Sequence, residues 1–88
     1  MRLQNMLSAR GNKVANQFEI FADDGVYFQS YQTMIAFKPY AGPVQLDRDA
    51  WDYSVTTGKY RNQFLREKKA ETEAKIKSGE YILTDLNA

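Results

Sequence analysis

Residues 51–66, WDYSVTTGKYRNQFLR, mark the change from a strand-like first half of the chain to a helix-like second half. They contain the only tryptophan and the most basic run of the sequence. A helix start at Thr56 is predicted, because Val55 and Tyr60 would then form a hydrophobic staple across the cap. Ser54 is the alternative capping residue, although it offers no staple.

The helical pattern continues from this start, so we expect helix within residues 54–78, with Ser78-Gly79 as the stop signal. The apolar stripe becomes thin in the second part of this segment. The pattern leaves open whether the segment forms one long helix or two. After it, the short run YILT at residues 81–84 allows a last strand.

Residues 14–46 are typical of β-hairpins, since apolar and polar side chains alternate between turn signals. Asp23-Asp24-Gly25 separates two strand-like runs and predicts the first hairpin turn. A three-residue loop would pair Ile20 with Phe28. We favour it over a two-residue loop because it separates apolar from polar side chains more completely.

This register gives the first hairpin one apolar face and one mixed face. The predicted core face contains Phe18, Ile20, Ala22, Val26 and Phe28. The mixed face combines aromatic rings with amides, which suits a protein interface; the alternative is that the N-terminal segment covers it. The candidate partner-binding residues on it are Phe21, Tyr27, Gln29 and Tyr31.

A third strand is predicted over residues 34–37, and a fourth over residues 44–46. Ile35 and Phe37 are both expected in the core, which requires a turn or bulge near residues 32–33 to restore the phase.

Residues 1–13 allow two interpretations. Leu3, Met6 and Leu7 are spaced as on two turns of an amphipathic helix, with Gly11 following as a stop. A partly docked arm is the alternative, since so short a helix is marginal alone.

The sequence therefore predicts an α+β fold, in which a small twisted antiparallel β-sheet of about four or five strands is packed by one or two C-terminal helices. No repeat or linker divides the chain, so residues 1–88 are expected to form a single domain.

Composition excludes several classes of function. The chain has no cysteine and no histidine. The lack of cysteine excludes disulfides and thiol nucleophiles, and the lack of histidine excludes serine-type catalytic triads. The usual zinc sites are excluded because both of their main ligands are missing. Residues 56–59 are not a phosphate loop, because Tyr53 stands where its first glycine is needed and Tyr60 where a serine or threonine is needed. Residues 47–58 are not a calcium loop, because Asp52 stands where its glycine is needed and Gly58 where its glutamate is needed. We therefore predict no catalytic residue, no metal and no cofactor.

Net charge and hydropathy indicate neither a strongly charged partner nor a membrane span. The formal net charge is +1, and no apolar run approaches the roughly 20 residues of a membrane span. The first seven residues are also too polar for a signal peptide. One cluster stands out after Tyr53, and it suggests contact with nucleic acid or another anion as an alternative function. Its cations are Lys59, Arg61, Arg66, Lys68 and Lys69.

Three stretches of the chain resemble an uncharacterised family of short bacteriophage and mobile-element proteins. They are GNKVANQF at residues 11–18, YFQSY at residues 27–31 and the pattern WDYSxTTxKYxxxFL at residues 51–65. The resemblance implies a phage or mobile-element accessory protein acting in the cytoplasm of a bacterial host cell. It implies no catalytic or binding residue.

Accessory proteins of this kind often bind and block a host machine, so we expect a non-enzymatic protein that binds a host or phage protein. An anti-defence inhibitor, of the anti-CRISPR or anti-restriction type, is one such role. The alternatives are a nucleic-acid-binding protein using residues 59–69 and a phage structural or assembly component that forms a homo-oligomer.

Overall fold

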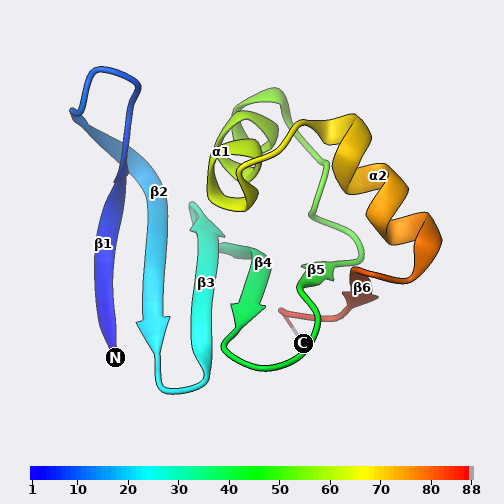
Figure 1. The fold of residues 1–88 in the computed structure, drawn as a ribbon. Coiled ribbons are helices and arrows are strands. Elements are labelled where there is room, and N and C mark those ends of the chain that lie inside the picture. Colours follow the sequence, from blue (N-terminus) through cyan, green and yellow to red (C-terminus); the bar gives the residue numbers. More distant parts are fainter. Residues whose placement is uncertain (88) are drawn as a thin grey trace.

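The computed structural model describes residues 1–87, which form one six-stranded sheet and two helices (Figure 1). The strands are β1 (Arg2–Leu7), β2 (Lys13–Ala22), β3 (Gly25–Ser30), β4 (Thr33–Pro39), β5 (Gln45–Asp47) and β6 (Ile82–Thr84). The helices are α1 (Val55–Leu65) and α2 (Lys69–Ser78).

The strands lie side by side in sequence order, each antiparallel to the next, except that β5 and β6 are parallel. Both helices lie between β5 and β6 in the chain, and this long crossover is what permits the parallel pair. The predicted α+β class is confirmed. The predicted sheet is corrected in two respects, because it has six strands and is mixed rather than wholly antiparallel.

The additional strand comes from the N-terminal segment, which forms β1 instead of the expected helix or arm. Side chains alternate along β1, so Met6 lies on the side of the sheet that faces the core, where it is 2% exposed. Leu3 pairs with Ile20 on the other face of the sheet.

The β2–β3 register differs from the predicted one. A two-residue turn at Asp23-Asp24 joins the strands, and Gly25 is the first residue of β3, opposite Ala22. A Cβ atom on Gly25 would lie only 2.4 Å from the carbonyl oxygen of Lys38. The glycine is thus required by the close approach of β4, and not by the turn to which the sequence pattern assigned it.

The new register divides the predicted core face between the two sides of the sheet. Phe28 packs toward the helices and is fully buried, with its ring 5.7 Å from that of Phe64 in α1. Ile20 is paired with Tyr27, the neighbour of Phe28, and therefore points to the opposite side. The prediction that Ile20 and Phe28 share a face was wrong.

A bulge restores the phase between β3 and β4, although it lies farther along the chain than expected. The ladder shifts between Phe28 and Gln29, and this leaves Ile35 as the extra residue of β4. Ile35 and Ala36 are both fully buried in the core. Phe37 was expected there too, but it pairs with Tyr27 on the opposite side.

Helix α1 is capped by Ser54, the alternative cap, and not by Thr56. The Ser54 side chain accepts a hydrogen bond from the Thr57 amide at 3.1 Å. The Thr57 hydroxyl, 1% exposed, lies 3.0 Å from the Ser30 hydroxyl in β3 and thereby ties the start of the helix to the sheet. Arg66 ends α1 in the left-handed conformation, with φ 57°, so the helical segment forms two helices.

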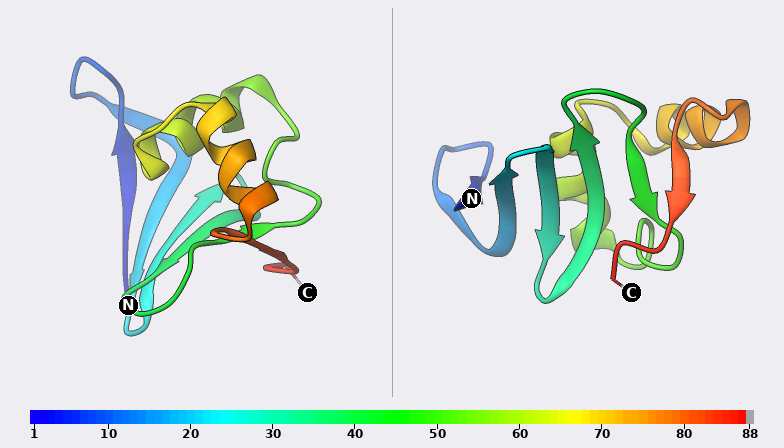
Figure 2. Two further views of the ribbon diagram at one scale, coloured as in Figure 1. Left: turned by 45° about the vertical axis from the view of Figure 1, so that its right-hand side comes forward. Right: turned by 90° about the horizontal axis from the view of Figure 1, so that it is seen from below.

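Both helices lie on the same side of the sheet (Figure 2). The core lies between these two layers and receives side chains from four strands, from α1 and from the connecting segments. Its buried apolar residues are Met6, Phe28, Ile35, Ala36, Leu46, Ala50, Tyr60, Phe64 and Tyr81.

Replacement of Gly25 by alanine should destabilise the domain by about 2–3 kcal/mol, because the added methyl group meets β4 backbone that cannot yield. Chemical denaturation measures this change in the free energy of unfolding. Gly42→Ala is the control, since Gly42 has φ 101° but no atom within 4 Å of an added Cβ. An equal loss of stability in the two variants would contradict the conclusion that β4 lies too close to Gly25 for a side chain.

Candidate protein-binding face

The side of the sheet that carries no helix has one side chain from every strand in a single row. The pairings run from Leu3 to Ile20, from Ile20 to Tyr27, from Tyr27 to Phe37, from Phe37 to Gln45 and from Gln45 to Ile82. We call these six residues the open-face row. Five of its six members are apolar or aromatic, whereas polar residues normally dominate the solvated face of a sheet.

The middle of the open-face row is rigid and its ends are accessible. The rings of Tyr27 and Phe37 are stacked, with centroids 4.1 Å apart and planes inclined by 17°. Two members of this middle part are nearly buried, with Phe37 6% and Ile20 7% exposed. At the ends, Leu3 is 55% exposed and Ile82 is 45% exposed.

A second, more polar row runs beside the first on the same side of the sheet. It contains Asn5, Phe18, Gln29 and Met34. Beyond the short strand β5, the side chain of Asn87 continues the sheet by bonding to β4: it accepts from the Met34 amide at 2.7 Å and donates to the Met34 carbonyl at 2.9 Å. The helix-free side thus combines apolar rings with amides that can form hydrogen bonds.

The structure brings together only part of the predicted partner-binding set. Tyr27 and Gln29 lie on the helix-free side. Tyr31 is in the adjoining β3–β4 turn, is 55% exposed, and its carbonyl accepts a hydrogen bond from the Gln29 side chain. Phe21 pairs with Val26 on the helix side of the sheet, where the guanidinium of Arg2 lies over its ring. Phe21 is therefore removed from the set.

Sequence reasoning missed the other apolar members of the open-face row: Leu3, Ile20, Phe37 and Ile82. Leu3 was placed on a short helix or a partly docked arm, and both Ile20 and Phe37 were placed in the core. The signal that would have found them is the register itself. Once Gly25 starts β3, Ile20 and Phe37 both follow Tyr27 to the helix-free side.

The fold buries one cation of the predicted basic cluster. Arg61 is 1% exposed and lies inside the domain, where it donates to the Trp51 carbonyl at 2.7 Å and to the side chains of Asp52 and Asn62. Its guanidinium also faces the Trp51 ring. Arg61 therefore holds the segment before α1 in place and presents no charge to an outside ligand.

Of the other four cations, Lys59 and Lys69 line one hollow together with Arg61 beside the start of α1. Lys69 makes an ion pair with Asp52 at 2.7 Å. This hydrogen bond, together with that from Arg61, lowers the pKa of the Asp52 carboxyl against the opposing effect of burial. Lys59, Arg66 and Lys68 are exposed.

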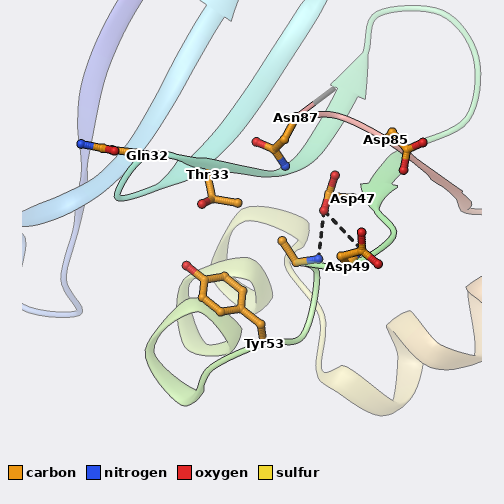
Figure 3. Close-up of a pocket in the computed structure, with 8 residues that line it drawn as sticks. Gln32, Thr33, Asp47, Asp49, Tyr53, Asp85 and Asn87 are labelled. Carbon is orange, nitrogen blue, oxygen red and sulfur yellow. Dashed lines mark hydrogen bonds between the residues drawn. The ribbon is translucent and has the colours of Figure 1, made fainter.

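A polar hollow of about 660 Å³ lies at the end of the sheet near the C-terminus. Figure 3 shows Asp47, Asp49 and Asp85 around it, opposite Tyr53. Asp47 is 5% exposed and accepts hydrogen bonds from the amides of Ala50, Leu86 and Asp49. Burial raises the pKa of this carboxyl, but the hydrogen bonds that it accepts together have a larger, opposite effect, so its pKa is lowered overall.

These hydrogen bonds assign Asp47 a structural role, because its oxygens are used to fix the turn after β5 and the segment after β6. Within residues 1–87, no three histidine, cysteine, aspartate or glutamate side chains are grouped so that they could hold a metal ion. Neither helix is long and apolar enough to cross a membrane within that same range.

Glu67 is a second buried carboxylate, placed in the link between α1 and α2. Its side chain is 4% exposed and accepts hydrogen bonds from Lys75 at 2.7 Å, Thr72 at 2.6 Å and the Tyr81 hydroxyl at 3.0 Å. Burial raises the pKa of Glu67, but these three donors outweigh burial and lower it overall. Glu67 thus fastens α2 and the entry to β6 to one point.

The comparisons with known proteins give one family. The model of a family of unknown function (DUF8033) matches residues 1–81. The comparison with curated proteins and the comparison with solved structures each gave no match.

Glu67→Gln should lower the free energy of unfolding by about 1–3 kcal/mol at neutral pH, since buried donors lose a charged acceptor. The pKa of Glu67 is lower in the folded state than its ordinary value of 4.5. Its contribution is therefore complete above that value and is lost as the pH falls through the folded pKa. Urea titrations across this range measure it, with the exposed Glu73→Gln as control. A difference that persists unchanged in acid would contradict the role of the carboxylate.

The burial of Arg61 predicts that nucleic acid binds poorly. We expect no measurable binding of short single- or double-stranded DNA or RNA at physiological salt, as followed by fluorescence anisotropy. Tight binding that weakens steeply as salt is added would contradict this expectation and would return attention to Lys59, Arg66 and Lys68.

Proposed function

We propose that this chain, which belongs to a family of unknown function (DUF8033), is a non-enzymatic accessory protein that binds another protein through the helix-free side of its sheet. One observation supports the proposal above all others: the open-face row crosses all six strands and no helix covers it.

The chemistry of this side suits a protein partner. Protein interfaces favour aromatic and other apolar side chains at the centre and polar groups at the rim. Here the stacked rings of Tyr27 and Phe37 form a rigid centre, and Gln29 and Gln45 supply amides beside it. Because the stack is already formed in the free protein, little side-chain entropy is lost when a partner covers it.

The biological setting is part of the same proposal. The resemblance of residues 11–18, 27–31 and 51–65 to phage and mobile-element proteins supports an accessory role in the bacterial cytoplasm. A small protein with a preformed apolar face can block a larger machine by occupying its working surface, and we propose an anti-defence inhibitor on that basis. The particular target follows from analogy of origin and not from the geometry.

The test compares the proteins that two double variants capture from bacterial lysate with those captured by the wild type, by quantitative mass spectrometry. The first variant, Tyr27→Lys with Ile82→Lys, places two charges on the open-face row. The second, Tyr53→Lys with Val55→Lys, is the matched control, because Tyr53 is 50% and Val55 92% exposed beside the start of α1.

We expect one or more proteins to be retained by the wild type and the control but lost by the row variant. The affinity of the purified partner should fall at least about tenfold, since a buried charge without a counter-ion is costly. Circular dichroism and unfolding midpoints establish that both variants are folded. Equal capture by all three folded proteins, or no specific capture by any, would overturn the proposal.

A further inference from the structure

The two edges of the sheet differ in how well they are protected against pairing with another chain. The edge strand β6 has three residues, and Asp85 follows it directly. The opposite edge strand, β1, has six residues, contains no proline and contains a single charged residue, Arg2. Short strands, prolines and several charges are the usual protections of an edge, and β1 has few of them.

The side chains of β1 alternate between the two sides of the sheet, so a strand that paired with β1 would meet different chemistry on each side. Leu3 and Asn5 lie on the helix-free side, at the end of the two rows described above. Arg2 and Gln4 lie on the helix side, opposite Phe21 and Glu19. The ladder between β1 and β2 is regular over this first part of the strand, from Arg2 to Asn5.

The N-terminal segment that forms this edge carries only positively charged side chains, and the nearest acidic residue in the ladder is Glu19 of β2, opposite Gln4. The first 18 residues contain Arg2, Arg10 and Lys13 but no aspartate or glutamate. All three cations are exposed, and within residues 1–87 none of them takes part in a salt bridge. Arg2 is the first residue of β1, Lys13 is the first residue of β2, and Arg10 lies in the loop that joins these two strands. Figure 1 shows this loop at the far end of β1 from the N-terminus.

We propose that β1 receives an extended acidic segment of the partner protein as a seventh strand. The unpaired amide and carbonyl groups of the edge would supply the main-chain hydrogen bonds. Apolar side chains of the incoming strand would continue the open-face row beyond Leu3. Its carboxylates, on the other side of the sheet, would lie beside Arg2.

Charge distinguishes this occupant from a second copy of the chain. Antiparallel pairing of two β1 strands over residues 2–5 would set Arg2 of each copy opposite Asn5 of the other, with no acidic side chain in either strand to neutralise it. An acidic strand would instead bring carboxylates to Arg2. The inference rests on the proposed function and adds to it the chemistry of the partner segment.

The experiment uses a short peptide of alternating glutamate and valine as the probe. A matched peptide has lysine in place of glutamate, and a third has the glutamate–valine sequence with its central amides N-methylated, which removes the donors of a strand. Nitrogen-15 NMR spectra of the whole protein at low salt report the affinity and the amides that respond.

We expect the glutamate peptide to bind at least about tenfold more tightly than the lysine peptide, and to perturb and protect the amides of residues 2–5. The N-methylated peptide should not bind. Arg2→Glu should reverse the preference between the two charged peptides, whereas Lys77→Glu, on the exposed surface of α2, should leave it unchanged.

Binding without preference for charge, perturbation elsewhere than β1, or no binding would overturn the inference. Protection of the β1 amides in the free protein, together with a dimeric mass by analytical ultracentrifugation, would overturn it too, because a second copy then occupies the edge. None of these results touches the capture experiment, which alters Tyr27 and Ile82 and leaves β1 intact. If the peptide experiment fails while capture from lysate still depends on the open-face row, the proposed pairing at β1 is refuted and the proposed protein-binding function is retained.

Discussion

The close approach of β3 and β4 at Gly25 determines which side of the sheet each side chain occupies. A side chain at this position would collide with the backbone of β4, so only glycine fits. Because side chains alternate along a strand, placing Gly25 opposite Ala22 assigns every residue of the hairpin to one side or the other. A shift of one residue would exchange the core with the surface.

The helix layer depends on this assignment, since α1 meets the sheet through residues that the register turns toward it. The Ser30 hydroxyl lies against that of Thr57 at the start of the helix. At the other end, the ammonium of Lys38 donates to the Phe64 carbonyl at 2.9 Å, a favourable position for a cation. Burial lowers the pKa of Lys38 there, partly opposed by Glu19. These contacts hold α1 against one side of the sheet.

The sequence predicted well what depends on local pattern. The α+β class, the strands between residues 14 and 46, the helical segment and the short last strand all follow from periodicity and from stop signals. The prediction failed where one sequence pattern is compatible with two different structures. Gly25 follows two aspartates and resembles a turn glycine, yet it serves strand packing. Leu3 and Met6 have helical spacing, yet alternation along β1 puts them on opposite sides of the sheet.

The candidate face was predictable only in part for the same reason. Tyr27 and Gln29 were identified from their chemistry, and the register retains them on the helix-free side. Phe21 was included and Phe37 excluded because the assumed register was displaced. The burial of Arg61 had no local signal, since its partners at Trp51 and Asp52 become neighbours only when the segment before α1 folds back on the helix.

The measurement that tests this account most directly is the set of cross-strand nuclear Overhauser contacts between β2 and β3 in solution. The structure predicts contacts that pair Ile20 with Tyr27 and Phe21 with Val26. Contacts that pair Ile20 with Phe28 would contradict it, because these residues would then share a face and Tyr27 would leave the open-face row.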